Sequence, residues 1–115
     1  MTISELVEYF VEIGVAQDKA ELRSEYAKYN RLFLKMDAVK SELKSREGDA
    51  RRFLLPLYDH PNMEVRYKAA LATLAVAPER ARAAIEEISK SGWFPQAGAA
   101  GMTLVNLDNG VFKPS

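Results

Sequence analysis

The sequence contains no cysteine, only one histidine and no excess of charge of either sign. Without cysteine the chain can form neither disulfides nor thiolate metal sites, and it has no cysteine nucleophile. With His60 as the sole imidazole, a zinc site built from three or four of the usual ligands is not expected. We therefore predict no metal and no cofactor. The lack of disulfide chemistry also fits a cytoplasmic protein.

The charge balance and the hydrophobic runs exclude further classes of function. Lys plus Arg total 16 and Asp plus Glu total 16, so the surplus of positive charge typical of nucleic-acid binders is missing. The longest apolar run, Leu71 to Ala77, is interrupted by Thr73 and is too short to cross a membrane. The first residues carry Glu5, Glu8 and Glu12, whereas a secretion signal begins with basic residues. We expect no membrane contact and regard nucleic acid as an improbable partner.

What the sequence does contain is helical periodicity. Thr2 and Glu5 match a capping box, and apolar residues follow at helical spacing until Gly14 weakens the helix. Asp18 can cap the next helix, for which residues 19–45 offer neither proline nor glycine. Such a helix would be about 40 Å long. The sequence therefore predicts an N-terminal helical pair over residues 2–46 with one long helix.

The remainder of the chain predicts two helical hairpins and a tail. Residues 49–76 form the first hairpin, in which Pro56 kinks or shortens the first helix, and Leu55 and Val65 should be core residues. Residues 78–108 form the second hairpin, and residues 109–115 form a tail docked through Phe112. The predicted fold class is all-α, an α–α superhelix of about six helices in one domain spanning residues 1–115.

A shift of 30 residues produces weak self-similarity between the two predicted hairpins. Ala69 to Leu74 aligns with Ala99 to Leu104, and Leu55 and Tyr58 fall on Ile85 and Ile88. Solenoid proteins repeat in this way because a single hairpin cannot bury its own apolar face.

Residues 54–72 resemble one HEAT repeat. The resemblance rests on Leu54-Leu55-Pro56-Leu57 before Asp59, followed by Asn62, Val65-Arg66, Ala69-Ala70 and Ala72. It implies that the proline kinks the first helix and that Arg66 hydrogen-bonds Asp59 or Asn62 in the turn.

The whole chain resembles a small, uncharacterised bacterial family of single-domain proteins. The resemblance implies an α–α superhelix and no established activity, and related small helical-repeat proteins include neutralisers of bacterial toxins. It rests on four strings of residues: Ala16-Gln17-Asp18, Asn30-Arg31-Leu32, Leu55-Pro56-Leu57-x-Asp59-His60-Pro61, and Ser91-Gly92-Trp93-Phe94-Pro95-Gln96-Ala97-Gly98-x-Ala100-Gly101-Met102-x-Leu104.

Four residues are candidates for contact with a partner. Lys28, Arg31 and Lys35 recur on one face of the long helix and could attract an acidic protein. Trp93 belongs to the residue types enriched at binding hot spots, although the interpretation we favour is a plug between two helices.

Four other residues could line a small pocket: Asp59, His60, Arg66 and Gln96. We interpret His60 primarily as a hydrogen-bonding residue of its turn, because no nucleophile lies near it in sequence.

Three hypotheses for the function follow. The first is a non-catalytic protein-interaction module, such as an adaptor or a toxin-neutralising protein. The second is a homo-oligomeric structural protein, a homodimer through the long helix with Leu22, Tyr29, Phe33 and Met36 as the self-contact. The third is a small-ligand-binding protein or enzyme that uses the pocket near His60.

Overall fold

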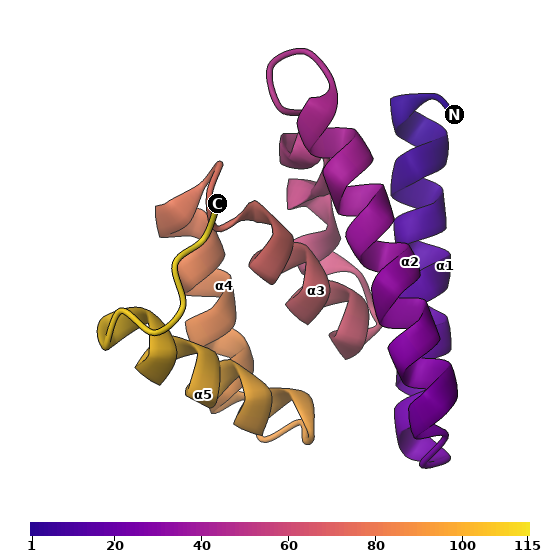
Figure 1. Cartoon of the computed structure of the whole chain (residues 1–115). Coiled ribbons are helices and arrows are strands. Elements are labelled where there is room, and N and C mark those ends of the chain that lie inside the picture. Colours follow the sequence, from indigo (N-terminus) through magenta and orange to yellow (C-terminus); the bar gives the residue numbers. More distant parts are fainter.

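The computed structural model describes residues 1–115 and consists only of helices and their connections (Figure 1). This confirms the predicted all-α fold of about six helices. The helices are α1 (Ile3–Leu22), α2 (Tyr26–Ser45), the 3-10 helix η1 (Ala50–Asp59), α3 (Met63–Thr73), α4 (Pro78–Lys90) and α5 (Gln96–Asp108).

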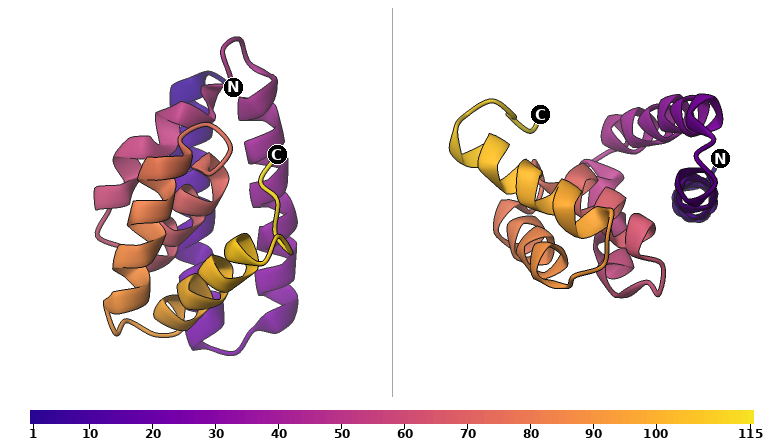
Figure 2. Two further views of the ribbon diagram at one scale, coloured as in Figure 1. Left: turned by 90° about the vertical axis from the view of Figure 1, so that its left-hand side faces the viewer. Right: turned by 90° about the horizontal axis from the view of Figure 1, so that it is seen from below.

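Helices that follow one another along the chain pack as pairs, α1 with α2, η1 with α3 and α4 with α5. Two views show α2 and α5 on the same side of the molecule, with α1 and α4 behind them (Figures 1 and 2). Helix α3 contacts elements of both outer pairs and therefore connects the two ends of the molecule. None of the helices has the length and hydropathy that a membrane span needs.

The predicted long helix over residues 19–45 is wrong, because the chain turns at residues 23–25 between two helices of 20 residues each. Ser24 adopts a left-handed conformation with φ of 55°. The Glu25 N–H then donates to the Ala20 carbonyl at 2.8 Å, as in a Schellman motif. Glycine is the usual residue at this left-handed position and would have predicted the end of the helix, whereas Ser24 does not.

Gly14 does not weaken the end of a helix as predicted; it lies buried in the middle of α1. A Cβ atom at this position would be 2.9 Å from Cγ2 of Val65 in α3. Gly14 therefore allows α1 and α3 to approach closely, and this packing outweighs its poor helix propensity.

Two apolar cores share α3. The first joins the α1–α2 pair to η1 and α3 and contains Phe10, Leu43 and Leu54, none of them exposed. The second joins α3 to α4 and α5 around Ile85 and is rich in alanine. Its small residues let α3, α4 and α5 pack at short distances.

Leu55 is not a core residue, contrary to the prediction, although Val65 is completely buried. The core position belongs to Leu54, whereas Leu55 is half-buried beside a cavity. The 3-10 geometry of η1, which contains Pro56, has three residues per turn and rotates each side chain about 20° further than an α-helix would. The C-terminal tail packs on the second core through Phe112, and the Lys44 ammonium donates to the Ser115 carbonyl at 2.5 Å.

Candidate functional site

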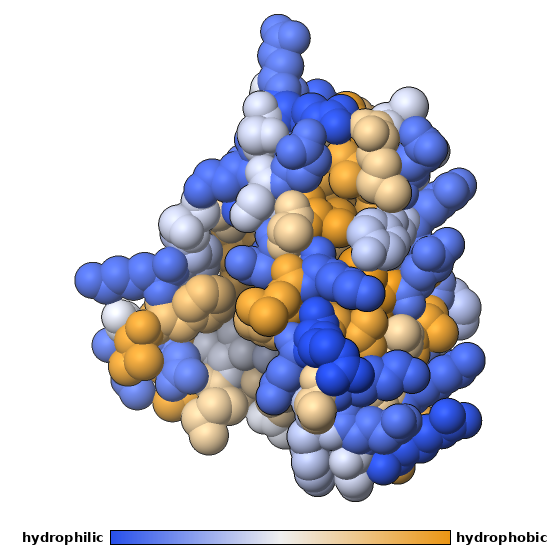
Figure 3. All heavy atoms as spheres, turned by 45° about the vertical axis from the view of Figure 1, so that its right-hand side comes forward, coloured by the Kyte–Doolittle hydropathy of each residue, from blue (hydrophilic) through white to orange (hydrophobic).

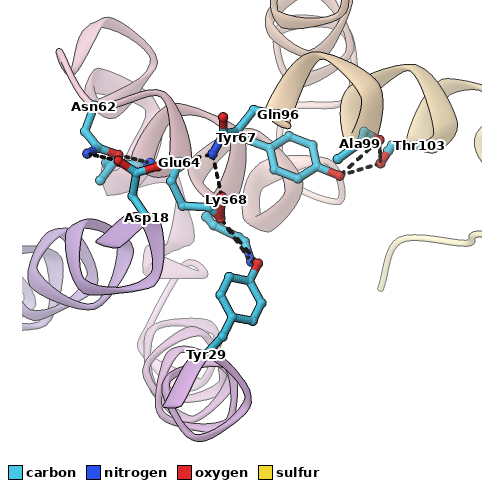
Figure 4. A network of polar contacts seen from close by, with 10 residues as sticks. Asp18, Tyr29, Asn62, Glu64, Tyr67, Lys68, Gln96, Ala99 and Thr103 are labelled. Carbon is cyan, nitrogen blue, oxygen red and sulfur yellow. Dashed lines mark hydrogen bonds and ion pairs between the residues drawn. The ribbon is translucent and has the colours of Figure 1, made fainter. Parts of the chain in front are cut away.

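A partly buried network of polar side chains lies where α1, α2, α3 and α5 meet (Figure 4). We call it the polar junction. Its members come from four elements that are distant in sequence, and they are Asp18, Tyr29, Asn62, Glu64, Lys68 and Gln96.

The ion pair between Glu64 and Lys68 is the charged part of the polar junction. Lys68 Nζ lies 3.4 Å from Glu64 Oε2, and only 8% and 5% of the Lys68 and Glu64 side chains are exposed. Lys68 also donates to the Tyr29 hydroxyl at 2.9 Å and lies 5.0 Å from the centre of the Tyr29 ring. The ring of Phe33 lies 5.6 Å from the same ammonium group. Helix α2 thus surrounds the buried cation with two aromatic faces, which attract it electrostatically.

The amide of Gln96 connects α5 to this pair. Gln96 Nε2 donates to Glu64 Oε1 at 3.0 Å and to Asp18 Oδ1 at 3.4 Å. Asp18 accepts a second hydrogen bond from Asn62 Nδ2 at 3.3 Å, and Asn62 in turn caps α3 through the Val65 N–H. Removing Glu64 or Lys68 alone would therefore leave the other charge buried without its partner, which is costly in a low-dielectric interior.

Two buried amide side chains have atoms without a hydrogen-bond partner in the protein. Gln17 is completely buried, and neither its amide oxygen nor its amide nitrogen contacts a protein partner. The same holds for Oε1 of Gln96. Of these two side chains, only Gln96 belongs to the polar junction.

The side chains of the polar junction use their charges and hydrogen bonds mainly to bind one another. Burial raises the pKa of the Tyr29 hydroxyl, while the adjacent Lys68 opposes the shift, so the phenol stays neutral and available as a hydrogen-bond partner at physiological pH. Lys68 is shared between a carboxylate and a phenol, and no nucleophile paired with a general base occurs in the network. No group of three or more acidic or histidine side chains is arranged to hold a metal ion.

A cavity of about 660 Å³ lies elsewhere, between η1, α3 and α4. Its charged lining comes from Arg52, Arg66 and Arg80, opposed by Asp59 and Glu87. The ion pairs of the structure involve none of these five side chains. Its walls also include apolar side chains, among them Leu55, Pro56, Met63, Ala84 and Ile88.

The predicted pocket residues are divided between the cavity and the polar junction. Asp59 and Arg66 line the cavity, whereas Gln96 is buried in the polar junction. His60 lines neither; its Nδ1 accepts the Asn62 N–H at 3.0 Å, and its carbonyl accepts a hydrogen bond from Arg66 Nε. Arg66 thus bonds within the inter-helix turn, but its partner is the backbone of His60 rather than the side chain of Asp59 or Asn62.

The residues predicted to meet a partner are exposed, on two separate surfaces. Lys28, Arg31 and Lys35 are exposed on α2. Because each helical residue turns about 100°, Arg31 and Lys35 lie roughly opposite Phe33, which faces α3. In Figure 3, hydrophilic side chains lie between apolar patches on the side of the molecule formed by α1 and α2.

Trp93 does not plug a joint between helices, contrary to the interpretation that we favoured, because 61% of it is exposed. Its neighbour Phe94 is 71% exposed and begins an apolar stripe along α5. Phe94 lies against Gly98, where an added Cβ would be 3.6 Å from the ring, and Met102 and Val105 continue the stripe with exposures of 62% and 52%. We call Phe94, Gly98, Met102 and Val105 the α5 stripe.

Comparison with known proteins identifies the family. A model described as "Domain of unknown function (DUF2019)" matches residues 4–108. The chain belongs to this family. The crystal structure of the protein RPA1889 from the bacterium Rhodopseudomonas palustris CGA009 is similar over 100% of this chain and 95% of that one, with 51% identity and a TM-score of 0.97. A search of curated proteins finds no match.

For this DUF2019 protein, sequence reasoning missed the polar junction and most of the charged lining of the cavity. One signal was available, since Glu64 and Lys68 are spaced four residues apart and so share a helix face. Nothing in the sequence shows that this face is buried or that Tyr29 and Gln96 reach it. The convergence of Arg52, Arg66 and Arg80 likewise depends on how three helices pack.

Proposed function

We propose that this DUF2019 protein is a non-catalytic module that binds another protein through the α5 stripe, together with Trp93. The observation that carries the proposal is a row of large apolar side chains that no element of the chain covers. Apolar patches of this kind on soluble proteins are typical of interaction surfaces, and aromatic residues and methionine are enriched there.

The stripe follows one side of a helix. Gly98, Met102 and Val105 are spaced four and three residues apart, which places them on one face of α5, and the Phe94 ring lies beside Gly98. The opposite side of α5, which includes Ala97, Ala100 and Leu104, packs into the protein. An exposed helix face of this composition suits an amphipathic helix of the partner, which would bury its own apolar side against it.

The polar junction supports this proposal by fixing the position of the stripe. Gln96 begins α5 and is held by Glu64 of α3 and Asp18 of α1. Tyr67 of α3 holds the next turn, since its hydroxyl lies 2.7 Å from the Thr103 hydroxyl and 3.3 Å from the Ala99 carbonyl. A preorganised surface loses less conformational entropy when it binds.

Within this class of function, an adaptor or a toxin-neutralising protein in the cytoplasm remains our more specific proposal. Such proteins act by covering a partner's surface, so they need no catalytic group. The absence of cysteine is in keeping with a reducing compartment. The resemblance of residues 54–72 to a HEAT repeat supports the same reading, because stacked helical hairpins commonly expose binding surfaces.

Affinity purification of the tagged protein from its native host tests the proposal with two matched variants. Met102→Glu places a charge in the α5 stripe, and we expect it to remove a stoichiometric protein partner while the fold is retained. A charge-reversed variant of Lys28, Arg31 and Lys35 alters a separate surface, on α2, and should retain that partner. If the charge-reversed variant alone loses the partner, binding occurs at the basic face of α2 and the stripe is not the site.

Light scattering distinguishes self-association. Met36 is buried in the first core and Tyr29 is bonded in the polar junction, so the proposed self-contact offers only Leu22 and Phe33 at the surface. We expect a monomer in solution. A dimer that Met102→Glu dissociates would instead make a second copy of the chain the occupant of the stripe.

A further inference from the structure

The cavity between η1, α3 and α4 combines unpaired positive charge with an apolar floor. Arg52, Arg66 and Arg80 against Asp59 and Glu87 leave a formal charge of +1 on the lining. Each arginine belongs to a different helix and lies near that helix's beginning. By comparison, Arg46 and Arg82 are paired with carboxylates.

The contacts of Arg66 and Arg52 within the protein leave donors of both guanidinium groups available. Arg66 uses Nε to bind the His60 carbonyl, so its two terminal nitrogens remain for another acceptor. Arg52 lies over the Phe53 ring at 4.7 Å, a stacking contact that leaves the planar edge of the guanidinium free. A guanidinium presents a fixed fork of donors that matches a carboxylate or a phosphate.

The remainder of the cavity is suited to a hydrocarbon group. Arg80, Ala84 and Ile88 are spaced four residues apart on α4 and therefore share one face of that helix. Along this face the lining changes from a positive charge at Arg80 to apolar side chains at Ala84 and Ile88. Leu55 and Pro56 of η1 form part of the opposite wall. The volume of about 660 Å³ lies within the range of about 300–1,000 Å³ that is typical of sites for small molecules.

From these observations we infer that the cavity binds a small amphipathic anion, with a carboxylate or phosphate head at the arginines and an apolar body against α4 and η1. This site is separate from the proposed protein-binding surface, because no residue of the α5 stripe lines the cavity. Leu55 lines the cavity and is half-buried, so an apolar ligand body would cover more of it.

Nuclear magnetic resonance titrations of the 15N-labelled protein test the inference with four probes: octyl phosphate, octanoate, inorganic phosphate and octanol. We expect octyl phosphate or octanoate to shift backbone amide signals around Arg66, Ala84 and Ile88 in a saturable manner. Whichever binds more tightly identifies the preferred head group. Inorganic phosphate and octanol should each bind at least about tenfold more weakly, since each supplies half of the interaction.

Three variants make the test specific to the cavity. Arg80→Gln should weaken binding of the better probe about tenfold, whereas Lys90→Gln, which removes one charge from the same helix outside the cavity, should change it less than about twofold. Ala83→Phe at an exposed lining position fills the cavity without changing its charge, and it should abolish binding. Binding of octanol as tight as that of octyl phosphate, or equal effects of Arg80→Gln and Lys90→Gln, would overturn the inference.

Discussion

Helix α3 carries charged side chains on two sides, and the two sets have different surroundings. Glu64 and Lys68 are buried and paired with each other, and Tyr29 and Gln96 complete their hydrogen bonding. Arg66 lies about 200° away from both around the helix and lines a solvent-accessible cavity whose charges form no ion pairs. The comparison separates charges that maintain the architecture from charges that remain available to bind something else.

The largest effect is expected from breaking the paired set. Lys68→Met leaves Glu64 as an uncompensated buried carboxylate, so we expect a loss of about 3–5 kcal/mol in the free energy of unfolding. The double variant Lys68→Met with Glu64→Gln removes both charges and should recover at least half of that loss. Urea denaturation at pH 7 measures both variants. A loss below about 1 kcal/mol in the single variant would mean that the pair is solvated and does not maintain the fold.

The two adjacent leucines of η1 sharpen the contrast between core and cavity. Leu54→Ala should cost about 2–5 kcal/mol, because Leu54 is fully buried in the first core. Leu55→Ala should cost less than half as much, since Leu55 is already partly accessible beside the cavity. Thermal and urea unfolding of the two variants provide the comparison. Equal losses would show that the cavity wall is as tightly packed as the core.

Two glycines inside helices allow a comparison between a tightly packed position and an open one. Gly14→Ala brings a methyl group to 2.9 Å from Cγ2 of Val65, and we expect a net loss of about 1 kcal/mol despite the better helix propensity of alanine. At Gly101 of α5 an added Cβ meets nothing within 4 Å, so Gly101→Ala should stabilise by about 0.5–1 kcal/mol. A Val65→Ala background should relieve the Gly14→Ala penalty in a double-mutant cycle. Stabilisation by both alanines in the wild-type background would contradict the close approach of α1 and α3.

The smallest effect concerns a paired and an unpaired aspartate near the ends of η1. Hydrogen bonds from the Arg51 side chain hold the pKa of Asp49 below its ordinary value. Because this pKa is lower in the folded protein, the stabilisation is present above the unfolded-state pKa and is lost as the pH falls through the folded one. Asp49→Asn should therefore remove less than about 1 kcal/mol at pH 7 and flatten the decline of stability below about pH 4. Asp59→Asn, at a residue with no ion pair, should leave that decline unchanged; unfolding measured from pH 7 to pH 3 decides.

The sequence predicted the helical class and most helix boundaries, because capping and punctuation are local. Thr2 with Glu5 begins a helix as expected, and Asn62 and Pro78 are equally local signals at the beginnings of α3 and α4. The turn at residues 23–25 escaped prediction, because a serine occupies the left-handed position where glycine is the usual signal. Gly14 was wrongly interpreted as weakening the end of a helix. A glycine is needed there because α1 packs closely against Val65, which lies 51 positions further along the chain.

The candidate sites were less predictable than the helices, because they depend on packing between helices. The exposure of Lys28, Arg31 and Lys35 followed from helical periodicity. Of the four predicted pocket residues, only Asp59 and Arg66 line the same cavity. The burial of Gln96 and the exposure of Trp93 did not follow, because residue type alone favours the reverse. Only the arrangement of α3 between α2 and α5 determines which of these side chains is covered.

Site-specific photo-crosslinking in the native host tests the central claim most directly. A photoreactive amino acid would replace Met102 in the α5 stripe, Lys35 on the basic face of α2, or Glu79 at an exposed position of α4 as a control. The account predicts one protein crosslinked in high yield from position 102 and not from positions 35 or 79. Crosslinks from position 35 alone, or equal background from all three positions, would contradict binding through the α5 stripe.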